Sequence, residues 1–84
     1  MNISKREQRV LHVLARGGRI QHERYGRKIV EIMCVTRDGF ILSDCTMDVF
    51  LRLRRRRLIE SRNGGPYHIS QRGWQSVRSQ ADNR

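Results

Sequence analysis

The sequence predicts an α+β fold, a small winged-helix-like domain, from three features of its pattern. The first stretch has the apolar spacing of a helix, and the middle has short apolar runs separated by turn signals, as in paired strands. Residues 46–61 have the pattern of a basic amphipathic helix that runs straight into the first strand of a second hairpin. The expected order is a helix, a three-stranded antiparallel meander, a basic helix, a wing hairpin and a short C-terminal helix. The 84 residues predict one domain over 1–84, too small for a deep catalytic cavity.

The first helix is predicted over Lys5 to Arg16. Ser4 followed by Glu7 forms a capping box in front of an apolar helical period, and the pair Gly17-Gly18 supplies the stop. The outer face of this helix is a basic stripe, because four residues recur at helical spacing: Lys5, Arg9, His12 and Arg16.

The middle of the chain predicts a three-stranded antiparallel meander. Its strands are expected at Arg19 to Arg24, Lys28 to Thr36 and Phe40 to Leu42, joined at Tyr25-Gly26-Arg27 and Arg37-Asp38-Gly39. The second strand is the most apolar run in the chain. We therefore expect it to be central and largely buried.

The basic helix is predicted from Thr46 to Arg57, with Ser43, Asp44 or Thr46 as its cap. At about 100° per residue, the apolar positions gather on one arc, while Asp48 and three arginines take the opposite side. The apolar arc consists of Val49, Phe50 and Leu53, and the three arginines of the opposite side are Arg52, Arg55 and Arg56. Arg54 and Arg57 point toward the packed arc and are expected to cover apolar surface with their stems.

A wing hairpin is expected to follow, with strands at Leu58 to Ser61 and Pro66 to Ile69 and a turn at residues 62–65 that exposes Arg62. Ser70 then caps a short last helix carrying Trp74 and Val77, whose first turn Gly73 weakens. The end of the chain, residues 79–84, is expected to be a frayed tail.

The charge balance points to an anionic partner. Lys and Arg number 18 against 8 acidic residues, a net charge of +10, and arginine favours forked contacts to phosphate or carboxylate. The candidate partner-binding or nucleic-acid-binding residues are Arg52, Arg55, Arg56, Arg62, Lys5, Arg9 and Arg16. The plainer alternative is a solvated face on which Asp48 pairs with Arg52 four residues later.

The sequence argues against an enzyme. His12, His22 and His68 fall in three different elements, and no nucleophile or carboxylate stands at a spacing that predicts a catalytic dyad, a metal site or a cofactor. Cys34 and Cys45 are expected to be buried thiols, not a metal or redox motif. The start lacks a signal-like apolar region, and no run is long enough to cross a membrane, so a cytoplasmic location is expected.

Several stretches carry a resemblance to a known family. They are LSDCT at Leu42 to Thr46, LIESRNGGPYHIS at Leu58 to Ser70, the residues EQR, LHVLA, GG and RI between Glu7 and Ile20, and the ending VRSQADNR. Over nearly the whole chain the sequence resembles the YjhX family of small bacterial proteins. The resemblance implies a toxin that binds and inhibits DNA topoisomerase I and is neutralised by a cognate antitoxin with an acetyltransferase-like fold. It carries over no binding residues.

Three functions follow as hypotheses. The first is a toxin-like inhibitor that engages DNA topoisomerase I, or its complex with DNA, through the basic helix and wing. The second is a winged-helix transcription regulator with Arg52, Arg55 and Arg56 in the major groove of DNA. The third is a structural partner whose charge only maintains solubility. A β-meander stands where a helix-turn-helix motif has a further helix, which weighs against an ordinary repressor.

Overall fold

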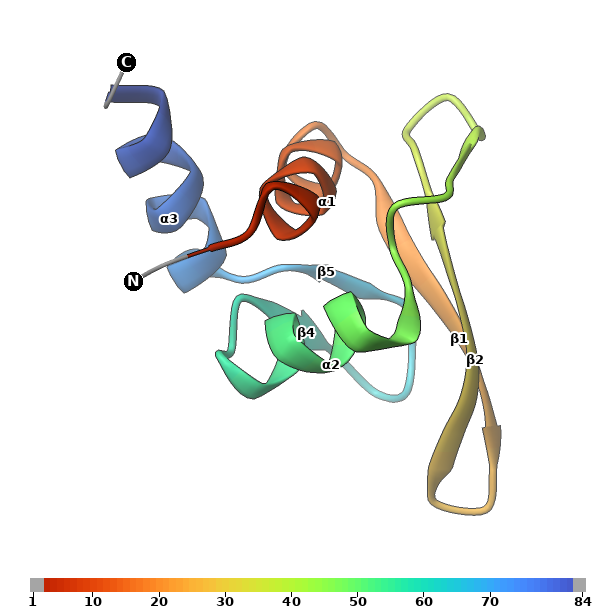
Figure 1. Cartoon of the computed structure of the whole chain (residues 1–84). Helices are drawn as coiled ribbons and strands as arrows, with labels where there is room; N and C mark the ends of the chain where they lie inside the picture. The colour runs from red at the N-terminus through yellow and green to blue at the C-terminus, as the bar shows by residue number, and fades with distance from the viewer. Residues whose placement is uncertain (1–2, 83–84) are drawn as a thin grey trace.

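The computed structural model describes residues 3–82, and it describes side chains for residues 3–78. These residues form three helices and a five-stranded antiparallel sheet with strand order β3-β2-β1-β5-β4 (Figure 1). The elements are α1 (Lys5–Ala15), β1 (Arg19–Tyr25), β2 (Lys28–Val35), β3 (Ile41–Leu42), α2 (Met47–Arg55), β4 (Ile59–Ser61), β5 (Tyr67–Ile69) and α3 (Gln71–Asp82). The predicted α+β class and the predicted order of elements are confirmed.

The core lies between the helices and one face of the sheet. Ile20 pairs with Cys34 on one side and with Tyr67 on the other, so these three side chains share a face. The Phe50 ring of α2 meets the Tyr67 ring edge-on, with centroids 5.0 Å apart. Each of the helices α1 and α2 adds three buried apolar side chains to the core. They are Val10, Leu11 and Leu14 from α1, and Val49, Phe50 and Leu53 from α2. The apolar periods that predicted these helices are therefore their buried faces.

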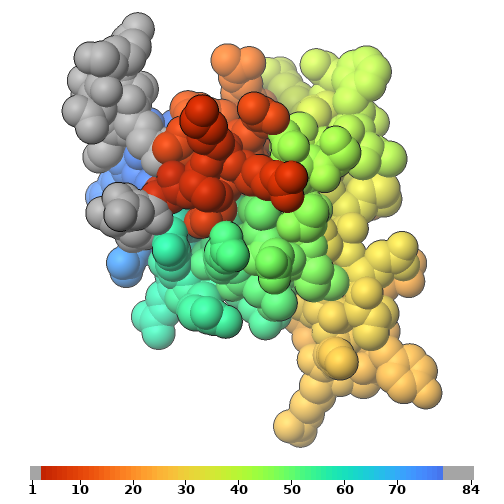
Figure 2. All heavy atoms as spheres, in the orientation of Figure 1, coloured from red at the N-terminus to blue at the C-terminus, as the bar shows by residue number. Residues whose placement is uncertain are grey.

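Strands β1 and β2 form a ribbon that extends beyond the helices, and Figures 1 and 2 show its turn projecting from the rest of the molecule. The prediction that β2 is largely buried is wrong, because only Cys34 and Val35 at its end are buried and Val30 is 51% exposed. The reason is that β3 is two residues long and pairs with β2 only at these two positions. The ribbon turn lies beyond the helices that cover the core.

The predicted wing hairpin exists as β4 and β5, which pair in register from Ile59 with Ile69 to Ser61 with Tyr67. This hairpin is part of the five-stranded sheet, because Tyr67 also pairs with Ile20 of β1. A winged-helix arrangement is therefore not established by the fold, although its component elements are present.

Helices α1 and α2 both begin at residues that the sequence offered as N-caps. Ser4 accepts a hydrogen bond from the Glu7 amide at 3.2 Å, and Thr46 accepts one from the Val49 amide at 3.3 Å. Thr46 is thus the cap among the three candidates that the sequence offered for α2.

Helix α3 begins after Ser70, whose hydroxyl accepts from the Gly73 amide and donates to the carbonyl of Arg57. A Cβ at Gly73 would lie 2.3 Å from the Leu58 carbonyl oxygen, so this glycine permits the close approach of α3 to the end of α2. Residues 79–82, which were expected to be part of a frayed tail, are helical. The rest of that predicted tail, residues 83 and 84, lies outside the described residues.

The two cysteines are buried, as expected, and the fold brings them together in the core. A hydrogen bond between the two thiols raises the pKa of Cys45, and burial raises it further. Cys45 therefore stays a protonated thiol at neutral pH.

Candidate functional site

Helix α2 carries the densest positive charge of the described surface. Arg52, Arg54 and Arg55 occupy its last turn, and Arg56 is its C-cap. Cations at a helix C-terminus are stabilised by the partial negative charge of the last carbonyls. The fold therefore tolerates this arginine run at one end of a short helix.

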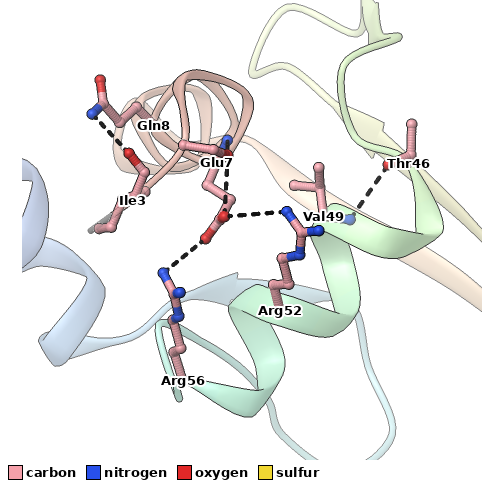
Figure 3. A network of polar contacts seen from close by, with 8 residues as sticks. Ile3, Glu7, Gln8, Thr46, Val49, Arg52 and Arg56 are labelled. Atoms are coloured by element: carbon pink, nitrogen blue, oxygen red, sulfur yellow. Dashed lines mark hydrogen bonds and ion pairs between the residues drawn. The ribbon is translucent and has the colours of Figure 1, made fainter. Parts of the chain in front are cut away.

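A buried carboxylate organises two of these arginines. Glu7 in α1 is 2% exposed, and it accepts a hydrogen bond from the Ser4 hydroxyl at 3.1 Å. Arg56 Nη1 donates to Glu7 Oε2 at 3.2 Å, and Arg52 Nη1 lies 3.9 Å from Oε1 (Figure 3). We call these three residues, Glu7, Arg52 and Arg56, the Glu7 cluster. Because two guanidinium groups share one carboxylate, the cluster retains one net positive charge.

The Glu7 cluster corrects the predicted geometry of α2. Arg52, Arg55 and Arg56 were expected to share one outward side, but Arg52 and Arg56 turn toward α1 and converge on Glu7. A buried carboxylate is costly unless a charged partner compensates it, and the four-residue spacing lets both arginines do so. The alternative pairing of Asp48 with Arg52 is not among the ion pairs of residues 3–78.

The other arginines at the end of α2 are Arg54, Arg55 and Arg57, and among the described side chains only Arg54 of these three has a ring contact. The guanidinium carbon of Arg54 lies 5.5 Å from the centroid of the Phe50 ring, so Arg54 covers apolar surface as expected. Arg55 is exposed and makes no ion pair with any acid whose side chain the structure describes. Arg57 is also exposed and has a positive φ of 60°.

The basic stripe of α1 is exposed along its length, as its spacing predicts. One of its cations is partnered, since Arg9 Nη1 donates to Asp44 Oδ2 at 2.7 Å and so ties α1 to the loop before α2. Lys5 and Arg16 have no acidic partner among residues 3–78. They remain available to an anionic partner.

Arg62 lies in the turn between β4 and β5, with its side chain 86% exposed. Its contact to Glu60 is 3.8 Å long, and a pair this exposed contributes little to stability. Arg62 is therefore free to exchange Glu60 for another anion.

Sequence reasoning identified the arginines but missed their acidic partners. The sequence identified Glu7 only as part of a capping box and Asp44 only as a possible helix cap. Both partnerships join residues at least 35 positions apart, so no local pattern signals them. Within residues 3–82 no three potential metal ligands come together, and no helix in that range has the length and apolar character to span a membrane.

Two comparisons with known proteins find matches that cover the full length of this chain. A family model described as "Putative toxin of bacterial toxin-antitoxin pair", YjhX_toxin, matches residues 1–84. The chain is 63% identical over 84 residues to a UPF0386 protein of Brucella anthropi, covering all of both chains. It is 67% identical over 85 residues to one of Rhodospirillum rubrum, covering all of this chain and 94% of the relative. No solved structure matches.

Proposed function

Because the chain belongs to the YjhX toxin family, we propose that it is a toxin that inhibits DNA topoisomerase I. Family membership implies a cognate antitoxin as its partner. The topoisomerase target, the acetyltransferase-like fold of the antitoxin and the cytoplasmic location belong to the proposal. They rest on the likeness to the family together with the strong positive charge.

The observation that carries the proposal is the surplus of guanidinium groups over carboxylates around α2 among the side chains of residues 3–78. The Glu7 cluster keeps one net positive charge, and the Arg52 side chain remains 53% exposed. Arg55 adds a further exposed cation on the same helix, and it forms no ion pair with the acids of residues 3–78. Like charges this close repel one another, and an anionic surface relieves that repulsion.

The proposed mechanism is occlusion, without catalysis by this chain. Arg55 and Arg62 are exposed and can each form bidentate contacts with a carboxylate of the enzyme or a phosphate of its bound DNA. Lys5 and Arg16 on α1 extend the charged surface and increase the rate of encounter. The inhibitor then occupies a surface that the enzyme needs to relax supercoiled DNA.

A relaxation assay with purified topoisomerase I tests the proposal. The variant Arg55→Glu/Arg62→Glu leaves the Glu7 cluster intact and changes exposed positions only, so we expect it to keep its fold. We expect the concentration for half-inhibition to rise at least about tenfold, which corresponds to about 1.4 kcal/mol of lost binding. The control Arg72→Glu/Arg78→Glu makes the same change in net charge on exposed positions of α3 and should inhibit like the parent chain.

Full enzyme activity at a large molar excess of the parent chain would end the topoisomerase proposal. Equal loss of inhibition in both variants would show that net charge acts alone, with no specific surface on α2.

Direct binding to DNA as a transcription regulator is the second candidate, and the net charge of +10 favours it. It predicts that log K falls with log salt by about 0.9 for each phosphate neutralised. The absence of any DNA complex at low salt would remove this candidate and leave the first one standing.

A further inference from the structure

An open groove of about 470 Å³ lies between α2 and the ribbon turn, on the flank of α2 that faces away from the Glu7 cluster. Its lining consists of Arg27, Lys28, Ile29, Met47, Leu51 and Arg54. At 100° per residue, Arg54 projects about 160° away from Arg52 and from Arg56 around the helix. The groove is therefore a separate surface from the one proposed above. In Figure 2 the ribbon flanks α2 on the visible face of the molecule.

The floor of the groove is apolar. Ile29, Met47 and Leu51 are partly buried and pack against the core, so each still presents part of its side chain to the solvent. Methionine adapts its shape to different partners at low cost. Such a floor favours a ligand that brings apolar side chains.

The rim of the groove is cationic. Arg27, Lys28 and Arg54 line it, and its lining includes no carboxylate from the part of the chain that the structure describes. Three other hollows on the described surface each include at least one acidic residue. The first includes Asp38, the second Glu23 and Glu31, and the third Glu60. The α2–ribbon groove thus has a charge pattern of its own.

One cation on the rim is held in place before any ligand binds, because Arg54 lies over the Phe50 ring. Arg27 and Lys28 are exposed, and their backbone is set by the tight ribbon turn, in which Gly26 has a φ of 63°. Lys28 also pairs with Tyr25 across the ribbon. A preorganised side chain such as Arg54 loses little conformational entropy when it binds.

We propose that this groove binds an acidic amphipathic segment of a partner protein, one that places carboxylates beside leucine-like side chains. The apolar floor receives the apolar side chains, and the three cations on the rim receive the carboxylates. A second copy of this chain is a poor occupant, since two molecules of net charge +10 repel each other. A nucleic acid would leave the floor unused, because no aromatic ring lines the groove for base stacking.

Methyl NMR on the full chain tests this inference, because two methionines report on two surfaces. Met47 lines the α2–ribbon groove, whereas Met33 lines a hollow on the opposite face of the sheet. The probe is a short synthetic helical peptide with leucine and glutamate four residues apart on one face. We expect the Met47 methyl signal to shift on titration while the Met33 signal stays.

The variant Arg27→Glu/Lys28→Glu should weaken peptide binding at least about tenfold. The control Arg72→Glu/Arg78→Glu, with the same change in net charge, should bind the peptide like the parent chain. Because Arg55 and Arg62 are untouched, the groove variant should still inhibit in the relaxation assay, so the two proposals fail separately.

Three results would overturn the inference. They are a Met47 signal that does not respond to the peptide, an equal response to a peptide with lysine in place of glutamate, and a larger response to a DNA oligonucleotide. The last would reassign the groove to nucleic acid.

Discussion

Helices α1 and α2 end in the same hydrogen-bond pattern, but different kinds of residue form it. In both, two consecutive amides after the helix turn back to carbonyls of the last turn, as in a Schellman motif. At the end of α1, the Gly17 amide donates to the Leu14 carbonyl and the Gly18 amide donates to the Val13 carbonyl. Gly17 has a φ of 104°, so glycine occupies the left-handed position.

At the end of α2, the Arg57 amide donates to the Arg54 carbonyl and the Leu58 amide donates to the Leu53 carbonyl. Arg57 holds the left-handed position with a φ of 60°, and Leu58 is fully buried in the core. The second position is thus glycine in α1 and a large apolar residue in α2.

The difference shows two ways to stop a helix. The end of α1 has glycine at both positions, Gly17 for its left-handed backbone and Gly18 because there is no room for a side chain. The end of α2 gains core packing from Leu58 but keeps a cation in a conformation that costs an L-residue about 1–2 kcal/mol. Substitutions at the two ends, and at the acid that joins the helices, test this contrast.

The largest effect is expected at Gly18, not at the left-handed Gly17. A Cβ at Gly18 would lie 2.9 Å from the carbonyl oxygens of both Val13 and Val35, neither of which can move without breaking the motif or β2. We expect Gly18→Ala to lower the free energy of unfolding by about 3 kcal/mol, measured by urea denaturation.

Gly17→Ala is the matched control for Gly18→Ala. The nearest atom to its new Cβ is in the flexible Arg37 side chain at 3.4 Å, so only the backbone strain remains, about 1–2 kcal/mol. A larger loss at Gly17 than at Gly18 would contradict the close-packed account of this helix end.

The next effect concerns Glu7, which joins α1 to the arginines of α2. Glu7→Gln keeps the shape but removes the charge that holds Arg52 and Arg56, so we expect about 2 kcal/mol of lost stability by urea denaturation. The loss is moderate because both arginines are partly exposed and can turn to water.

Glu60→Gln removes an equal charge from an exposed pair and should change stability by less than about 0.5 kcal/mol. If both substitutions cost the same, the Glu7 cluster is an ordinary surface contact and its burial has no energetic role.

The helix ends also show what the sequence could predict. The cap at Ser4, the glycine stop of α1 and the hairpin turns were all accessible, because each depends on residues within about four positions of one another. The cap of α2 was narrowed only to Ser43, Asp44 or Thr46. The end of α2 gave no comparable signal, since its left-handed residue is an arginine inside a run of four.

The candidate site was less accessible than the fold. The arginines were identified from their number and spacing, but the turn of Arg52 and Arg56 toward Glu7 depends on how α1 packs beside α2. The exposure of β2 was missed for a similar reason. An apolar run indicates a strand, but its burial depends on the length of the strand beside it and on where the helices end.

The smallest effect is expected at Arg57, and it has the opposite sign. Arg57→Gly relieves the left-handed strain but makes the unfolded chain more flexible, so we expect a net gain of about 0.5–1 kcal/mol in the free energy of unfolding. Arg55→Gly is the control, because Arg55 has helical geometry and glycine there should cost about 1 kcal/mol. A gain at Arg57 together with weaker inhibition in the relaxation assay would mean that the chain retains this arginine for its anionic partner at the expense of stability. No gain would mean that the motif holds arginine without strain, and the two helix ends would then differ only in the space available to Gly18.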